Sequence, residues 1–225
     1  MIVPCIDLHR GKAVQLVQGR RCVLAVEDVL GLLERFRRYP ILHVIDLDAA
    51  FGHGHNDRWV RLICQRAPMR VRVGGGIRSV ARAKKVLKWG ADKVIVGSTA
   101  FCQGQINYRF LRRLVARVGR HRVMLALDAK GGQVVVRGWR QQLRLRAEEI
   151  IRELEPYCSE FLCTCVDREG RMRGTDLNWF RRLRQQTQRP ITAAGGIRSL
   201  REVKALARLG MKSAVGMALY LERLR

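Results

Sequence analysis

Acidic residues are scarce in this sequence. Its 225 residues contain 19 Asp and Glu against 44 Lys and Arg, which gives a net charge of +25. Such an excess of positive charge is typical of proteins that bind nucleic acids. However, the basic residues are spread through expected helices such as 109–122 and 181–189. The chain also lacks a basic tail, an aromatic-interleaved basic stripe and any zinc-finger or RNA-recognition motif. We therefore expect a solvated basic face that attracts anionic substrates, and no specific nucleic-acid binding.

Long hydrophobic runs and paired cysteine motifs are also missing. No apolar run approaches the roughly 18 residues of a membrane span, and residues 1–5 begin a strand rather than a signal peptide. The seven cysteines are odd in number and form no C-x-x-C pair or Cys/His cluster of zinc spacing. We therefore expect a cytoplasmic protein with free, mostly buried thiols, no bound metal and no cofactor.

No Pro-, Gly- or Ser-rich linker divides the chain, so its length favours one large core. Short β-branched runs alternate with longer amphipathic segments, a pattern typical of parallel strands with crossover helices. Eight such runs predict one α/β domain over residues 1–225, a small (β/α)8 TIM barrel. The expected strands are 2–6, 41–45, 71–73, 94–96, 123–127, 161–165, 190–193 and 213–215.

The two halves of the chain repeat one pattern at a spacing of about 120 residues. Gly75 and Gly195 stand in matching Gly-Gly-Ile-Arg-Ser segments, and Asp7 and Asp128 each end an apolar run. Segments 12–18 and 133–137, just beyond these two aspartates, each read as a short hairpin. The repeat predicts a barrel built from two half-barrels, of about residues 1–118 and 119–225.

Each half contributes two glycine turns that lead into a helix. Free N–H groups and the positive end of a helix dipole favour an anion at such a place. We define the first cradle as Gly75, Gly76, Gly97 and Ser98, and the second as Gly195, Gly196, Gly216 and Met217. Arg78 follows the first glycine pair and is placed to clamp a phosphate. We expect one phosphate in each cradle.

Acidic and polar candidates fall where the expected strands end, the edge that carries the chemistry in TIM barrels. They are Asp7, Asp128 and Thr164. Two carboxyl groups can share acid/base work when their surroundings protonate one and leave the other ionised. An aspartate after a strand also fits a capping role. Trp139, in the second hairpin, fits either stacking on a flat heterocycle or an apolar lid.

Several segments together resemble the HisA family of histidine-pathway isomerases, over essentially the whole chain. They are 2–8 (IVPCIDL), 14–19 (VQLVQG), 43–48 (HVIDLD), 73–78 (VGGGIR), 136–139 (VRGW) and 215–220 (VGMALY). The resemblance implies an Amadori rearrangement, in which the aminoaldose ProFAR becomes the aminoketose PRFAR. It also implies a substrate with a phosphate at each end, as the duplicated cradles suggest independently.

The resemblance assigns roles to single residues. Asp7 would be the general base, Asp128 the proton donor or a residue that supports it, and Thr164 a contact to the ribose segment. In the loop after Thr164 the chain departs from the family pattern at Cys165, Glu169 and Arg171. Glu169 stands where the family has an acid that protonates the ring oxygen. Glutamate keeps the carboxyl group and extends its reach by one methylene.

Three alternatives stay open. A bifunctional enzyme would also isomerise phosphoribosyl anthranilate, and sequence does not separate it from a ProFAR isomerase. The cyclase of the same pathway shares the repeat, but its first strand typically leads to a lysine, whereas this chain reads Ile6-Asp7-Leu8. The third is a non-catalytic basic barrel that binds nucleic acid or a protein partner. We expect a monomeric isomerase.

Overall fold

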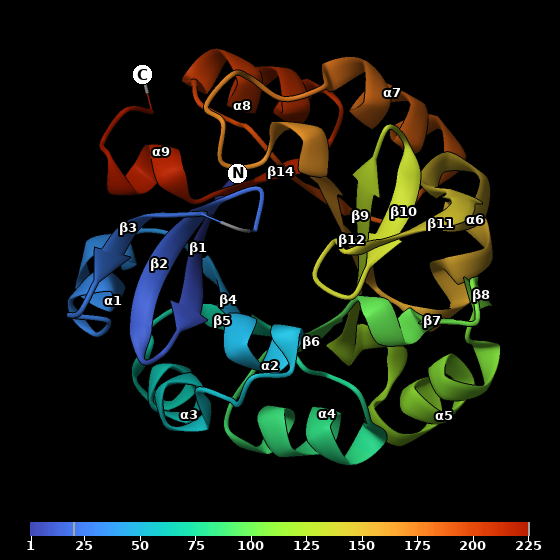
Figure 1. Ribbon diagram of the computed structural model, residues 1–225, viewed down its shortest axis with the longest axis horizontal. Coiled ribbons are helices and arrows are strands. Elements are labelled where there is room, and N and C mark those ends of the chain that lie inside the picture. The colour runs from blue at the N-terminus through green and yellow to red at the C-terminus, as the bar shows by residue number, and fades with distance from the viewer. Residues whose placement is uncertain (20, 225) are drawn as a thin grey trace.

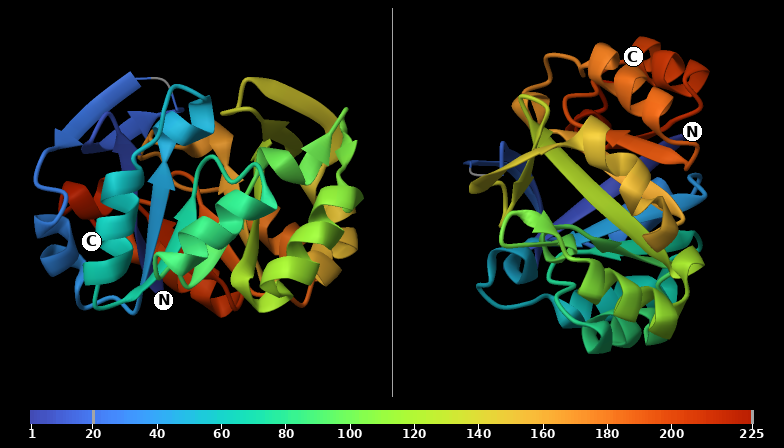
Figure 2. Two further views of the ribbon diagram at one scale, coloured as in Figure 1. Left: turned by 90° about the horizontal axis from the view of Figure 1, so that it is seen from below. Right: turned by 90° about the vertical axis from the view of Figure 1, so that its right-hand side faces the viewer.

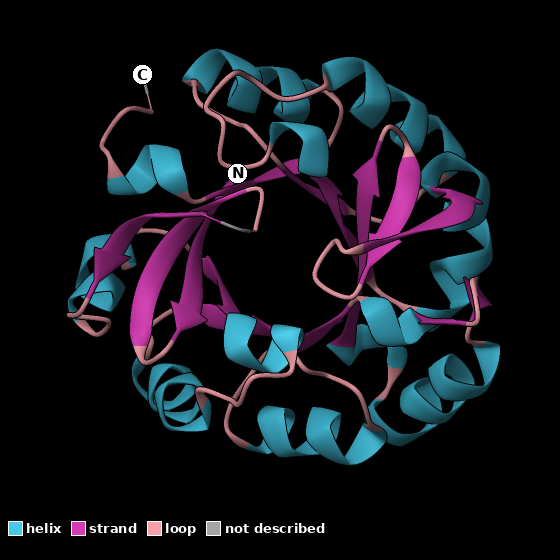
Figure 3. Cartoon of the chain, viewed as in Figure 1, coloured by secondary structure: helices cyan, strands magenta, loops and turns pink. Residues whose placement is uncertain are grey.

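The computed structural model describes residues 1–19 and 21–224 as a closed barrel of parallel strands surrounded by helices (Figures 1 and 3). The barrel strands, in pairing order, are β1 (Ile2–His9), β4 (Ile41–Asp46), β5 (Arg70–Gly74), β6 (Lys93–Val96), β9 (Val123–Lys130), β12 (Glu160–Cys165), β13 (Ile191–Ala194) and β14 (Lys212–Val215). Strand β14 pairs with β1 and so closes the ring. The eight expected strands and the TIM-barrel fold are confirmed.

Each half of the barrel carries a β-hairpin after its first strand. Strand β2 (Lys12–Val17) runs antiparallel to β1 and is followed by β3 (Arg21–Val26), while β10 (Gln133–Val136) runs antiparallel to β9 and is followed by β11 (Gln141–Arg146). Figure 2 shows both hairpins at the same end of the barrel. The outer strands β3 and β11 were not predicted. The boundary between half-barrels near residue 118 stays a prediction.

Helices and short turns fill the connections. The helices are α1 (Gly31–Phe36), α2 (Leu47–Phe51), α3 (Asp57–Arg66), α4 (Val80–Lys88), α5 (Tyr108–Val118), α6 (Ala147–Leu154), α7 (Leu177–Gln186), α8 (Leu200–Arg208) and α9 (Met217–Tyr220). The smaller elements are η1 (Ser98–Ala100), β7 (Phe101–Cys102), β8 (Gln105–Ile106), η2 (Arg120–Arg122), η3 (Glu155–Tyr157) and η4 (Val166–Arg168). No described helix is long and apolar enough to cross a membrane.

Two apolar regions hold the barrel together. The larger lies between strands and helices and includes Phe36, Phe161 and Phe180, which are fully buried. A smaller cluster inside the barrel contains Ile95, Met124, Leu162 and Ala214. Successive side chains along a strand point alternately into the barrel and toward the helices. Because both sides are buried, nearly every strand position is apolar. This explains why the strands appear in the sequence as continuous hydrophobic runs.

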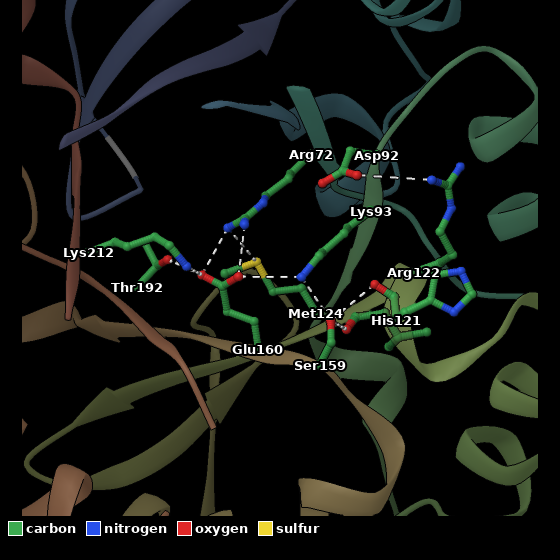
Figure 4. A network of polar contacts seen from close by, with 11 residues as sticks. Arg72, Asp92, Lys93, His121, Arg122, Met124, Ser159, Glu160, Thr192 and Lys212 are labelled. Atoms are coloured by element: carbon green, nitrogen blue, oxygen red, sulfur yellow. Dashed lines mark hydrogen bonds and ion pairs between the residues drawn. The ribbon is translucent and has the colours of Figure 1, made fainter. Parts of the chain in front are cut away.

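A buried polar cluster lies inside the barrel, near the N-terminal ends of the strands (Figure 4). The carboxylate of Glu160 is paired bidentately with Arg72, through N···O distances of 2.9 and 2.8 Å. Lys212 Nζ lies 2.7 Å from the same carboxylate and Lys93 Nζ lies 3.5 Å from it. Burial alone would raise the pKa of Glu160, but Arg72 and Lys212, with a hydrogen bond from Thr192, lower it to about 2. The carboxylate is therefore ionised and binds together four strands.

Candidate active site

A cavity of about 890 Å³ lies at the opposite end of the barrel, where the strands end and both hairpins stand. It brings together most of the residues singled out from the sequence: Asp7, Asp128, Glu169, Thr164, Trp139, Arg78, Gly75, Gly76, Gly97, Ser98 and Gly216. Gly195, Gly196 and Met217 do not line it. The two cradles therefore contribute unequally to the cavity. All four residues of the first cradle line it, whereas only Gly216 of the second does.

Asp7 and Glu169 are two acids of this cavity whose proton affinity is raised. Burial raises the pKa of Asp7 to about 7. Burial, and then the charges of Asp7 and Asp128, raise the pKa of Glu169 to about 7 as well. Carboxyl groups that face one cavity resist simultaneous ionisation, so near neutral pH one can be a base while another is an acid.

Asp128 is held differently from these two acids. Burial raises its pKa, while hydrogen bonds from Thr164 and Trp139 act in the opposite direction. The indole Nε1 of Trp139 donates to Oδ2 of Asp128 over 2.8 Å. Thr164 is the residue opposite Asp128 in the β9–β12 register. Asp128 is thus an acceptor oriented by two side chains, whereas the carboxyl of Glu169 is bonded by the backbone N–H of Gly170.

Trp139 closes part of the cavity mouth. A side-chain carbon at Gly19 would lie 3.0 Å from the Trp139 ring, so only glycine allows this close approach. Gly138 allows a similar approach to the ring of Phe51 on α2. The β10–β11 loop therefore contacts both the first hairpin and the segment after β4. Trp139 combines two roles, since its ring covers the site and its N–H fixes Asp128.

The first cradle is open at the start of α4. Ser79 caps this helix by accepting from the backbone N–H of Arg82, and the first turn contains no acid. A Cβ at Gly97 would meet only one atom within 4 Å, at 3.7 Å, so its backbone is accessible from the cavity. Ser98 accepts a hydrogen bond from the backbone N–H of Arg137, and Arg78 donates to the carbonyl of Ala50. Backbone N–H groups, a hydroxyl and a guanidinium therefore surround a space suited to phosphate.

The second cradle differs from the first mainly at the start of its helix. The close approach of backbone to its glycines does not distinguish it, because the Cys165 carbonyl lies against Gly195 as the Asp46 carbonyl lies against Gly75. At the start of α8, the carboxylate of Glu202 accepts from the backbone N–H groups of Arg198 and Ser199, at 3.0 and 3.2 Å. An internal carboxylate thus occupies donors that an anion would otherwise use. Gly216 remains the cradle's contact with the cavity.

The loop that carries Glu169 lies against the first hairpin. Gly170 has a φ of +68°, and any side chain there would overlap the backbone of Leu16 and Val17. The N–H of Gln18 donates to the carbonyl of Glu169 over 3.4 Å. This contact fixes the backbone of Glu169 at the cavity wall, and its side chain lines the site.

Sequence reasoning missed several lining residues. Cys5, expected only as one of the free thiols, and His43 both line the cavity, as do Gln15, Arg137 and Arg140. The side chain of Gln15 lies against Gly216. The pattern Val-Gln-Leu in an alternating strand was the available signal for Gln15, because a polar residue between apolar ones must face somewhere polar. Among the described residues, no group of three or more His, Cys, Asp or Glu side chains could hold a metal ion.

Comparisons with known proteins agree with this arrangement. Residues 1–225 match a family described as histidine biosynthesis protein. A relative from Methanocaldococcus jannaschii is 36% identical, over 98% of this chain and 93% of its own length. A relative from Methanothermobacter thermautotrophicus is 34% identical, over 98% and 93% respectively, and one from Myxococcus xanthus is 36% identical, over 99% and 94%.

All three relatives are named as isomerases of one compound. It is a 1-(5-phosphoribosyl)imidazole-4-carboxamide that carries a (5-phosphoribosylamino)methylideneamino group at position 5. The printed names thus describe a substrate with two phosphoribosyl groups.

Proposed function

The chain belongs to the histidine biosynthesis protein family, and we propose from this membership and its cavity that it is the isomerase that converts ProFAR to PRFAR. The single observation that carries the mechanism is the group of three carboxyls facing one cavity, with pKa values of Asp7 and Glu169 raised to about 7. The Amadori rearrangement is redox-neutral within the substrate, so proton transfers are the chemistry that the protein must supply.

Glu169 is the group that opens the ribose ring in this proposal. Its raised pKa keeps a large fraction protonated near neutral pH, so it can give a proton to the ring oxygen as the C1′–O bond breaks. The electron pair of the exocyclic nitrogen then forms the protonated Schiff base at C1′. The negative charges of Asp7 and Asp128 favour this cation, because they face the same cavity.

Asp7 is the base for the next step. Its carboxylate removes the proton from C2′, and the electrons of that C–H bond neutralise the iminium, which gives an enolamine. The enolamine becomes the aminoketose when C1′ gains a proton and the C2′ hydroxyl loses one. Net proton uptake is zero, so Asp7 and Glu169 exchange roles over one turnover and each returns to its starting state.

Asp128, Trp139 and Thr164 position the reacting sugar in this scheme. The bonded indole and hydroxyl hold the Asp128 carboxylate in one orientation, where it can accept a hydrogen bond from a ribose hydroxyl. General acid–base catalysis supplies about 10²- to 10⁴-fold, so much of the remaining acceleration must come from orientation. Phosphates at the first cradle and at Gly216 would fix the two ends of the substrate.

Purified protein incubated with ProFAR tests the proposal, with product formation followed by chromatography. We expect turnover by the wild type and a loss of at least about 10²-fold in Asp7→Asn. Gln142, which hydrogen-bonds to the Lys130 carbonyl away from the cavity, provides a control: Gln142→Ala should keep full activity. Unchanged ProFAR with the wild type, or full activity in Asp7→Asn, would refute the assignment.

A further inference from the structure

More than half of the net charge comes from one continuous segment of the chain. Between Asp57 and Arg120 there are 16 Lys and Arg residues and only two acids, Asp57 and Asp92, so this segment carries +14 of the total +25. It comprises the outer helices α3, α4 and α5 with their strands. Figure 1 shows these three helices next to one another along one side of the barrel, and the left view of Figure 2 looks onto them.

Both acids of this segment are already neutralised. Asp57 lies 2.6 Å from Arg82 and 3.1 Å from Lys85, and its side chain is 16% exposed. Asp92 lies 4.0 Å from Arg122. The remaining surface is therefore cationic. This contrasts with α6, whose sequence AEEIIREL contains three glutamates.

The exposed cations lie in rows along the helices. Their members are Arg58 and Arg61 on α3, Lys84 and Lys88 on α4, and Arg109, Arg113 and Arg117 on α5, which we call the basic wall. All are exposed, and none has an ion-pair partner among the described residues. Residues at i and i+4 are neighbours about 5–6 Å apart on a helix, and like charges there are destabilising. A bound polyanion would remove this repulsion.

The side chains of the basic wall favour binding to the phosphates of a polyanion over insertion into a lipid bilayer. Arginines predominate in it, and their planar guanidinium groups bind phosphate oxygens bidentately. The described large apolar side chains that are exposed are Met1, Val23, Leu200 and Leu221, and none belongs to the basic wall. Insertion into a membrane interface needs such side chains on the basic face.

We infer that the basic wall binds a flexible single strand of nucleic acid through its phosphates, without sequence preference. The three helices follow the convex outside of the barrel (Figure 1), and a duplex with a persistence length of about 150 base pairs would touch only part of such a curve. The expectation against nucleic-acid binding rested on cations that are spread along the sequence. The fold gathers the cations of residues 57–120 on one side of the barrel, away from the cavity, whereas those of 181–189 lie on and after α7. Binding at the wall therefore leaves the isomerase site open.

Matched double substitutions test the inference with a fluorescent 20-nucleotide single-stranded RNA. Arg113→Glu/Arg117→Glu on α5 and Lys84→Glu/Lys88→Glu on α4 each reverse one i, i+4 pair of the wall. Lys204→Glu/Arg208→Glu on α8 makes the same charge change on an exposed i, i+4 pair outside it. Fluorescence anisotropy is measured between about 50 and 200 mM salt, the range over which phosphate contacts weaken most visibly.

We expect the wild-type affinity to fall steeply with salt. Each wall variant should bind at least about tenfold more weakly, with a log–log salt slope smaller in magnitude by about 1.4, because each lost contact to a single strand removes about 0.7. The α8 variant should stay within about twofold of the wild type. Circular dichroism confirms that each variant is folded, so a lost interaction is not mistaken for unfolding.

Three results would overturn the inference. Equal weakening by all three variants would mean that only net charge matters. No RNA binding by the wild type at 50 mM salt would leave the wall without this ligand. Tighter binding to vesicles containing phosphatidylserine than to RNA would assign the surface to membranes. None of these outcomes depends on ProFAR turnover, so the proposed isomerase activity is tested separately.

Discussion

Replacing Glu160 by glutamine should destabilise the barrel strongly without touching the cavity. The carboxylate is 2% exposed and balances Arg72, Lys93 and Lys212 (Figure 4). Its pKa falls from 4.5 to about 2 in the folded protein. One pKa unit corresponds to about 1.36 kcal/mol, so this interaction is worth about 3 kcal/mol. That agrees with the roughly 3–5 kcal/mol lost when one partner of a buried ion pair is removed.

Urea unfolding across pH measures this loss. A lowered folded-state pKa stabilises the protein above the unfolded pKa of 4.5 and loses that contribution as the pH falls to about 2. Glu160→Gln should therefore cost about 3 kcal/mol at pH 7, and the difference from wild type should shrink between pH 4.5 and 2. Glu149→Gln, at an exposed position of α6, is the control and should stay within about 0.5 kcal/mol. A difference below about 1 kcal/mol at pH 7, or one independent of pH, would refute the reasoning.

Three further substitutions distinguish residues that act on the substrate from residues that stabilise the fold. Trp139→Phe keeps a ring at the mouth but removes the 2.8 Å bond that orients Asp128, so kcat/KM for ProFAR should fall about 10-fold or more; a wild-type kcat/KM would contradict this. Gly97→Ala adds a methyl group whose nearest neighbour lies 3.7 Å away, so the melting temperature should not change. The KM for ProFAR should rise, because the methyl group faces the expected phosphate. An unchanged KM would show that Gly97 does not belong to the phosphate site. Gly75→Ala should lower the melting temperature, because its φ is +89° and the Asp46 carbonyl occupies the Cβ position; wild-type stability would show that this backbone can relax.

The barrel could be predicted because its strands are local features of the sequence. Runs such as Val94–Val96 are apolar on both sides, and segments 12–18 and 133–137 follow repeat aspartates. The outer strands β3 and β11 escaped prediction, and both are mostly exposed in the fold. Gln141–Arg146 is largely polar and resembles a loop, whereas Arg21–Val26 is largely apolar but lies outside the barrel. Their pairing depends on the hairpin that precedes them rather than on their own pattern.

The site was only partly predictable because the repeat hides an asymmetry. The glycine loops around Gly75 and Gly195 look equivalent, yet only the first lines the cavity. One signal was present in the sequence: Ser199 and Glu202 have the spacing of a capping box, which supplies an internal anion at α8. The cations around Glu160 come from strands far apart in the sequence, so no local pattern indicated that cluster.

The pH dependence of kcat/KM for ProFAR, in wild type, Asp128→Asn and Glu169→Gln, tests the acid/base assignment most directly. With ionised Asp7 as base and protonated Glu169 as acid, both with pKa near 7, the wild-type profile should be a narrow bell centred near neutrality. Glu169→Gln should lower the rate by about 10²- to 10⁴-fold and abolish the alkaline limb, because no acid remains to deprotonate, while the acidic limb persists. Asp128→Asn should lower the rate but keep both limbs. An alkaline limb that survives in Glu169→Gln and disappears in Asp128→Asn would contradict the account and make Asp128 the acid.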